Sequence, residues 1–264
     1  MAYYLTLLAD KLLTRQQVPD DLPISADDIY LSPHCDDIAF SIGRFAQARG
    51  KGRLVTFFSR SAFTSKPGLG GQSVDAVTAL RQAEERRFAD ACGLVLTHFD
   101  MPEAPLRGFA PTEHDKAAEQ AATLGPEIVP KLLALGPEDE RGKRPWLFAP
   151  TAIGGHLDHV ILLLLIASNR AALERRFRLA FYEDLPYAVW HEARVVGLQR
   201  FRSLFGLLGW RRCSFPLGAD VPAKLDLMNL YESQHPKPPE IAEYSPELRP
   251  PLPPHEAIWV KGRV

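Results

Sequence analysis

The sequence lacks the features that mark several specialised classes of protein. It has three cysteines, Cys35, Cys92 and Cys213, and no Cys-x-x-Cys pair, which excludes a disulfide framework and a zinc knuckle built from paired cysteines. Scattered cysteines favour a reducing compartment, so we expect a cytoplasmic protein. No Gly-x-Gly-x-x-Gly follows the first expected strand, which leaves a nucleotide-binding Rossmann enzyme unsupported.

Neither sign of charge dominates, and apolar runs are short. Lys and Arg total 31 and Asp and Glu total 32, so nothing favours nucleic acid as a partner. The longest apolar run, at residues 160–167 (VILLLLIA), is too short to cross a bilayer, and we expect no transmembrane segment. Residues 1–15, MAYYLTLLADKLLTR, have no basic start and no small-residue cleavage site. They are predicted to form a short amphipathic helix and not a signal peptide.

What the sequence does contain is a regular alternation of apolar strands and amphipathic helices. Hydrophobic residues make up 46% and charged residues 24% of the 264 residues, a balance typical of globular domains. The alternation predicts an α/β fold, a Rossmann-like, mostly parallel sheet with helices on both faces. The expected strands are residues 28–32, 53–58, 94–99, 146–150 and 178–182, and the expected helices are 37–48, 74–92, 113–135 with an interruption near Gly125-Pro126, and 159–172.

The alternation weakens after Tyr182. A chain of this length can bury a large core without a structural metal, so any metal is expected to be catalytic. We expect one domain over residues 1–264, with about 183–264 forming an irregular C-terminal cap or extension. Within it, residues 201–210 (FRSLFGLLGW) are expected to pack on the domain or a partner, or to lie on a membrane surface. Further expectations are a helix at 223–231, an irregular Pro-rich segment at 236–254 and a last strand at 255–261.

The first cluster of reactive side chains is Ser-Pro-His34-Cys35-Asp36-Asp37, at the end of the first expected strand. His34 and Asp37 are three residues apart on a strand-to-helix turn and can reach one ion, and imidazole and carboxylate both suit zinc. Asp36 would then stay free for proton transfer. The alternative is that Asp36 and Asp37 only cap the helix. Cys35 could also bind zinc, although a buried neutral thiol is the usual state of such a cysteine.

The second cluster, Gly-Gly-His156-Leu-Asp158-His159, follows the fourth expected strand and opens a helix. His156 and His159 could share one helical face; alternatively, Asp158 caps the helix and both histidines lie on the surface. Both clusters fall at carboxyl ends of expected strands, where α/β sheets place their sites. Three protein ligands plus water is the pattern of catalytic zinc. Together the clusters predict a metal-dependent hydrolase site.

Other charged residues have weaker claims to function. Arg60 follows the second expected strand and could bind a sugar hydroxyl or a phosphate, or be a solvated charge. Glu183 and Asp184 follow the fifth expected strand and could line the pocket. Charged residues in the helix at 74–92 are expected to be mostly ion pairs on its face. The histidines without partners in sequence, expected to be scaffold or surface, are His98, His114, His191, His235 and His255.

The paired motifs resemble those of the PIG-L/LmbE-like zinc-dependent N-deacetylases, which show His-x-Asp-Asp after the first strand and His-x-Asp-His after a later one. Here they read His34-Cys-Asp-Asp37 and His156-Leu-Asp-His159. The likeness extends to Arg81 with Glu-Glu in the long helix and to Tyr-Glu-Ser-Gln near the C-terminus. Many members read His-Pro-Asp-Asp-Glu, but the Ser-Pro-His-x-Asp-Asp and Tyr-Glu-Asp-Leu-Pro-Tyr segments resemble a branch without that Glu.

The resemblance implies roles for the clustered residues. His34, Asp37 and His159 would bind Zn²⁺, Asp36 would be the general base, and His156 would stabilise the oxyanion. Asp158 would hydrogen-bond a histidine and set its tautomer. The implied reaction removes an acetyl group from the amide nitrogen of an N-acetylglucosamine-type amino sugar or glycoconjugate.

Some alternatives stay open at the level of the sequence. The same ligands accept Fe²⁺, and the chain could form an oligomer. A different metal hydrolase, such as a phosphoesterase, would use more carboxylates and often two metals. An inactive, family-like binding module is the other alternative.

Overall fold

The computed structural model describes residues 16–17, 22–66, 68, 71–137, 144–206, 208–246 and 252–262. The helix expected at residues 1–15 lies outside these residues. Within the described residues, no helix is long and apolar enough to cross a membrane.

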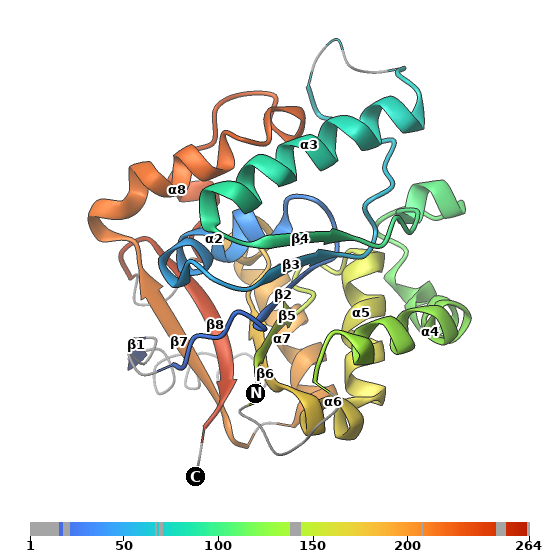
Figure 1. The fold of residues 1–264 in the computed structure, drawn as a ribbon, viewed down its shortest axis with the longest axis vertical. Coiled ribbons are helices and arrows are strands. Elements are labelled where there is room, and N and C mark those ends of the chain that lie inside the picture. The colour runs from blue at the N-terminus through green and yellow to red at the C-terminus, as the bar shows by residue number, and fades with distance from the viewer. Residues whose placement is uncertain are drawn as a thin grey trace.

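An eight-stranded sheet of the described residues forms the centre of the molecule (Figure 1). The strand order is β1-β7-β8-β6-β5-β2-β3-β4. β8 runs antiparallel to both of its neighbours, whereas the other neighbouring pairs are parallel, which confirms the expected fold class. The strands are β1 (Gln16–Gln17), β2 (Ile29–Ser32), β3 (Arg53–Thr56), β4 (Val95–His98), β5 (Trp146–Pro150), β6 (Arg178–Tyr182), β7 (Trp210–Pro216) and β8 (His255–Lys261).

Helices cover both faces of this sheet. In Figure 1, α2, α3 and α8 lie on one side and α4, α5, α6 and α7 on the other. The helices are α2 (Asp37–Arg49), α3 (Val74–Cys92), α4 (Ala117–Ala134), α5 (Leu157–Ser168), α6 (Arg170–Arg176), α7 (His191–Phe205) and α8 (Val221–Met228). The short 3-10 helices are η1 (Ala104–Arg107), η2 (His114–Lys116), η3 (Tyr187–Val189), η4 (Gly218–Asp220), η5 (Glu232–Gln234) and η6 (Ile241–Glu243).

The central strands bring the two motifs together. Every residue of β2 and β5 is buried, as expected for parallel strands that helices cover on both faces. β2 and β5 are parallel neighbours, with Ile29 opposite Leu147. Their carboxyl ends therefore meet at one edge of the sheet, and the loops that carry the two histidine motifs begin side by side.

Two helices differ from the expectation. α4 continues through Gly125 and Pro126 without the expected interruption, and a Cβ at Gly125 would lie 3.1 Å from the Leu165 side chain of α5. Close packing against α5 thus explains why a poor helix former is kept inside α4. The helix expected at 159–172 is instead two helices, α5 and α6, that meet at Asn169.

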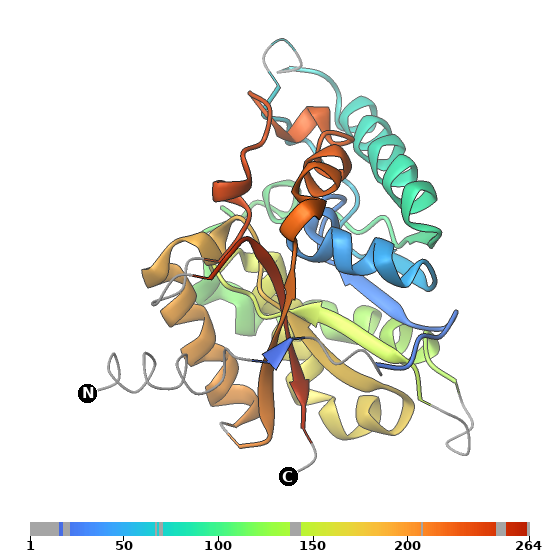
Figure 2. The same cartoon turned by 90° about the vertical axis from the view of Figure 1, so that its left-hand side faces the viewer.

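The C-terminal part contributes more to the sheet than the sequence indicated. β8 was expected, but β7 was not, and the two pair along their whole length from Trp210–Lys261 to Pro216–His255. Figure 2 shows them side by side, with α8 following soon after the end of β7. The alternative that residues 201–210 lie on a membrane surface does not fit their aromatic side chains, which face the core. Phe201, Phe205 and Trp210 are buried and pack on one another and on Phe181.

A break inside α2 is held by a buried ion pair. The backbone leaves the helical conformation at Ile42, with φ −137° and ψ 32°. Lys224 Nζ donates to the carbonyl oxygens of Ala39 and Phe40 at 2.9 and 2.6 Å, and lies 2.7 Å from the Glu256 carboxylate. Glu256 in turn accepts from two backbone N–H groups beyond the break. The backbone carbonyl and N–H groups that lose their helical hydrogen bonds at the break thus find other partners. These contacts fix the first turn of α2 against the sheet.

Candidate active site with a metal centre

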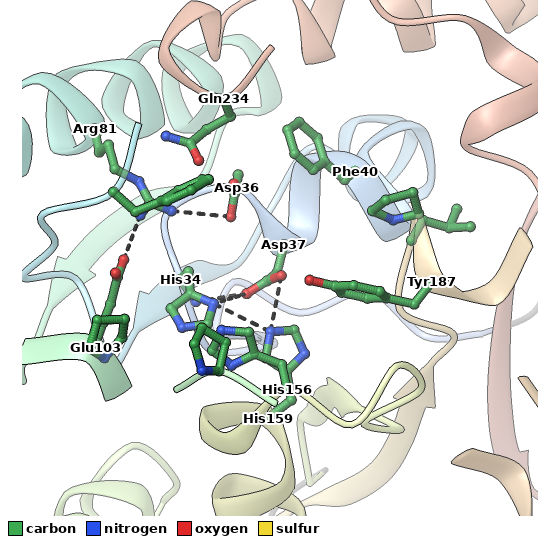
Figure 3. Close-up of a pocket in the computed structure, with 15 residues that line it drawn as sticks. His34, Asp36, Asp37, Phe40, Arg81, Glu103, His156, His159, Tyr187 and Gln234 are labelled. Atoms are coloured by element: carbon green, nitrogen blue, oxygen red, sulfur yellow. Dashed lines mark hydrogen bonds and ion pairs between the residues drawn. The ribbon is translucent and has the colours of Figure 1, made fainter. Parts of the chain in front are cut away.

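A cavity of about 240 Å³ opens at the carboxyl ends of β2 and β5. It brings both histidine motifs to one place, because side chains from both loops line it (Figure 3). Its other walls come from the loop after β3, from α3, from the segment after β4, from the loop after β6 and from the C-terminal part. The lining residues are His34, Asp36, Asp37, Phe40, Phe63, Arg81, Glu103, Pro105, Pro111, His156, His159, Leu185, Pro186, Tyr187 and Gln234.

Three of the predicted ligands present their donor atoms to a common point. His34 Nδ1 and His159 Nε2 are 3.3 Å apart. Each also lies 3.3 Å from an oxygen of the Asp37 carboxylate. Tetrahedral zinc with bonds of about 2.0–2.1 Å has its donors about 3.3 Å apart. The spacing of these three side chains therefore fits one zinc-sized ion.

Buried carboxylates hold the outer nitrogens of both imidazoles. Asp158 Oδ2 lies 3.1 Å from His34 Nε2, and Asp184 Oδ1 lies 2.8 Å from His159 Nδ1. Each ring is thereby oriented with its other nitrogen toward Asp37, an arrangement typical of metal-binding histidines. Arg107 in turn binds the other Asp158 oxygen at 2.6 Å.

A second ligand set also lies within reach. His34, His156 and His159 each offer a nitrogen within 4.8 Å of the others. However, His156 Nδ1 accepts a hydrogen bond from the backbone N–H of Asp158 at 3.2 Å. The set that contains Asp37 is tighter, and it leaves His156 free for another role.

The electrostatics of the cluster favour a cation. Burial by itself lowers the pKa of His34, but hydrogen bonds to Asp158 and Asp37 raise it well above its ordinary value. Burial likewise opposes the charged form of His159, yet its pKa rises to about 9 because Asp37 and Asp184 lie beside it. Buried carboxylates thus surround the point between the imidazoles, and a bound metal would meet that negative charge.

Asp36 lies on the cavity wall outside this ligand set. Burial raises the pKa of Asp36 to about 6, while the Arg81 guanidinium acts in the opposite direction. Arg81 Nη2 is 3.5 Å from Asp36 Oδ1; its other terminal nitrogen binds Glu103 and the Ser61 hydroxyl. A carboxylate with a pKa near neutrality is suited to proton transfer.

His156 is the neutral member of the histidine cluster. Burial and the neighbouring His34 and His159 lower the pKa of His156 to about 2. Since Nδ1 accepts the Asp158 N–H, the proton of the neutral ring belongs on Nε2. That nitrogen can donate a hydrogen bond to a group in the cavity.

Comparison with known proteins places the chain in a family. It is 33% identical over 213 residues to 2'-N-acetylparomamine deacetylase of Streptomyces fradiae, covering 78% of this chain and 72% of that protein. The chain belongs to the PIG-L/LmbE-like N-deacetylases. This confirms the expected enzyme class, an amidohydrolase of the N-deacetylase type, and the family implies that the enzyme depends on a metal.

Solved structures agree with this assignment at the level of the fold. The A40926 pseudoaglycone deacetylase Dbv21 superposes with a TM-score of 0.57 at 19% identity, covering 88% of this chain and 95% of that one. The zinc-inhibited form of teicoplanin deacetylase Orf2 gives a TM-score of 0.51 at 17% identity, covering 78% and 83%. No protein-family model matches the chain.

Two predicted substrate contacts of this PIG-L/LmbE-like deacetylase are corrected. Glu183 is buried and binds Arg194, Arg212 and the Trp259 indole. Its carboxylate therefore has its hydrogen-bond partners within the core and does not face the cavity. Asp184 is also buried, and it binds His159 rather than facing the cavity.

Arg60 has a different neighbour from the one expected. Its guanidinium lies 3.5 Å from Asp75 and is half-exposed, and it is not among the described residues that line the cavity. Its predicted contact with substrate stays a prediction.

Sequence reasoning missed Tyr187 as a cavity residue of the deacetylase. Its ring lies across from His159, with the ring centres 6.4 Å apart, and Figure 3 shows the hydroxyl pointing toward Asp37. Within the described part of the chain, that hydroxyl makes no hydrogen bond. A Cβ at Gly154, where φ is +90°, would lie 2.3 Å from the Tyr187 ring. The first glycine of the second motif therefore makes room for this tyrosine, and Tyr187 is also the last residue of the Tyr-Glu-Asp-Leu-Pro-Tyr segment noted in the sequence.

Proposed function

We propose that this chain removes the acetyl group from the amide nitrogen of an N-acetylglucosamine-type amino sugar, free or in a glycoconjugate. Zinc held by His34, Asp37 and His159 would be its cofactor, and Fe²⁺ suits the same ligands. The observation that carries this proposal is the 3.3 Å spacing of the three donor groups, with the Asp36 carboxylate on the same cavity wall but outside this set.

The shape and polarity of the cavity support a sugar substrate. At about 240 Å³ it is smaller than the roughly 300–1,000 Å³ of sites for drug-sized ligands, so it suits one amino-sugar unit. Arg81, Glu103 and Gln234 form a polar wall that can bind hydroxyl groups, and Phe40 and Tyr187 offer an apolar wall. The Streptomyces fradiae relative is by name a deacetylase of an acetylated amino sugar.

Each of these cavity residues would have its own role in the reaction. Zinc, when bound, would supply Lewis acidity, which polarises a carbonyl and makes water more acidic. Asp36 would accept a proton from water as that water attacks the acetyl carbon, and would pass it to the departing amine. His156 would donate from Nε2 to the oxygen that becomes negative. Asp158 and Asp184 would act through the histidines that they orient. The products are acetate and a free amine.

The three cysteines of the chain are free thiols and buried. A reducing compartment preserves such thiols, which supports the cytoplasm as the place where the enzyme works.

A substrate screen with metal control tests the proposal. Acetate release would be measured from N-acetylated amino sugars and their conjugates, before and after chelation, and again after zinc or Fe²⁺ is restored. We expect release from at least one such compound, loss with the chelator and recovery with metal. Release that is insensitive to the chelator would contradict the metal requirement. No release from any of them, from protein shown to be folded and metal-loaded, would contradict the substrate class.

A further inference from the structure

A second group of side chains of the kinds that bind metals lies next to the active site but outside the cavity. Cys35, Glu85 and His98 each offer one donor atom, and the three atoms lie within 4.8 Å of one another. They come from the loop after β2, from α3 and from the end of β4. Cys35 and Glu85 are each 1% exposed, so the group is not a chance cluster on the surface.

Glu85 is the centre of this group. Its Oε2 lies 2.6 Å from His98 Nε2, and its Oε1 accepts from the Thr56 hydroxyl at 2.6 Å. Within the described residues, no Lys or Arg forms an ion pair with Glu85, and His98 is its one ion-pair partner. A buried carboxylate needs a compensating positive charge. A cation bound between Glu85 and His98 would supply it.

We propose that Cys35, Glu85 and His98 form a second divalent-metal site, with the preference for zinc that these ligands have. Thiolate, imidazole and carboxylate are all zinc ligands, and a thiolate selects against magnesium and calcium. The site shares no ligand with the group of His34, Asp37 and His159. The two are nevertheless adjacent, because Cys35 follows His34 directly in the chain.

A small movement makes room for the ion. Donors bound at about 2.0–2.1 Å lie about 3.3 Å apart, so His98 and Glu85 must separate by a little under 1 Å. The His98 side chain is 10% exposed and that of Glu85 1%, so His98 is the side from which an ion can enter. Binding requires the thiolate of Cys35 and a ring nitrogen of His98 with a free lone pair, and the thiol proton passes to solvent.

Cobalt(II) titration of the metal-free full-length chain tests this site. A thiolate bound to cobalt gives a near-ultraviolet charge-transfer band, whereas a site built from His34, Asp37 and His159 has only nitrogen and oxygen donors and gives none. We expect two equivalents to bind and the thiolate band to appear with one of them. One equivalent and no band in the wild-type protein would overturn the proposal, and this result needs no variant.

Variants assign the band and separate this proposal from the proposed function. Cys35→Ser should abolish the band and keep one equivalent of cobalt, whereas the matched Cys213→Ser, another buried free cysteine, should keep both. A band that persists in Cys35→Ser would overturn the assignment. His159→Ala should lose the other equivalent and keep the band, so either site can fail without the other.

Discussion

Asp184 Oδ1 lies 2.8 Å from Nδ1 of His159, and both side chains are buried. The other oxygen of the carboxylate accepts from the Thr151 hydroxyl and the Ile153 backbone N–H at 2.7 and 3.0 Å. Asp184 is therefore fixed on both sides, and it fixes in turn the direction in which His159 presents Nε2.

The first prediction concerns this contact. Asp184→Asn keeps the shape of the side chain but removes the charge that supports His159 as a ligand. Because partners of metal-bound histidines typically contribute 10- to 100-fold to affinity, we expect zinc affinity to fall by about that factor. Competition with a chelator of known affinity measures it. The control is Asp90→Asn, on the exposed face of α3. Equal zinc affinity in the Asp184 variant and the wild type would contradict the role given to this carboxylate.

Asp36 should separate metal binding from turnover. Asp36→Asn removes the proton acceptor but leaves His34, Asp37 and His159 in place. General bases typically contribute about 100- to 10,000-fold, so we expect the rate of acetate release to fall by at least about 100-fold. Elemental analysis should find unchanged metal content. Wild-type turnover in this variant would remove Asp36 from the mechanism, and loss of metal would show that it is a ligand instead.

Tyr187→Phe should affect substrate and not the fold. The Tyr187 hydroxyl makes no hydrogen bond in the described structure and points toward Asp37 (Figure 3), so a bound substrate is its natural partner. One hydrogen bond contributes about 1 kcal/mol, and we expect kcat/KM to fall roughly 5- to 10-fold with no change in Tm. The control is Tyr244→Phe, whose hydroxyl lies 3.4 Å from His235 and outside the cavity. An unchanged kcat/KM in Tyr187→Phe would exclude the contact.

His255 gives the fold a specific dependence on pH. Arg212 lies 2.9 Å from Nε2 of His255, and Nδ1 lies 2.9 Å from the Pro253 carbonyl oxygen, so the ring is held neutral. Burial, together with Arg212, lowers the pKa of His255 to about 4, whereas in the unfolded chain it is about 6.5. Between these values the unfolded state binds the proton, so stability falls as pH falls from about 6.5 to 4.

The expected loss from this one group is about 2–3 kcal/mol over that range. Denaturant unfolding at several pH values would measure it in the wild type and in His255→Gln, which cannot titrate. The variant should lose less stability than the wild type between pH 6.5 and pH 4. Parallel curves for the two proteins would contradict the neutral, buried state of this histidine.

The sequence predicted those parts of the fold that local pattern determines. β5, β6, β8 and α3 begin and end where they were expected, because each is a distinct apolar or amphipathic run with clear end signals, such as Gly93 after α3. β7 was missed because WRRCSFP carries two arginines in a row. Its strand conformation depends on pairing with β8, about forty residues further along the chain. The local sequence pattern carries no information on that contact.

The residues of the candidate site likewise fall into those that the sequence could place and those that it could not. The motifs placed His34, Asp37 and His159 within one coordination sphere, since strand ends in a parallel sheet converge. The two acidic residues after β6 could not be assigned from sequence. Adjacent residues face opposite ways, so Glu183 meets the arginines of α7 and β7 while Asp184 meets His159. Only the folded chain shows which partner each one finds.

The position of the metal tests the central claim most directly. Crystals of zinc-loaded protein would give an anomalous difference map at the zinc edge. We predict a peak about 2.0–2.2 Å from His34 Nδ1, His159 Nε2 and the Asp37 carboxylate, with Asp36 beside it and unbound. A map with no peak between these three side chains, or with Asp36 as a ligand in place of Asp37, would contradict the account.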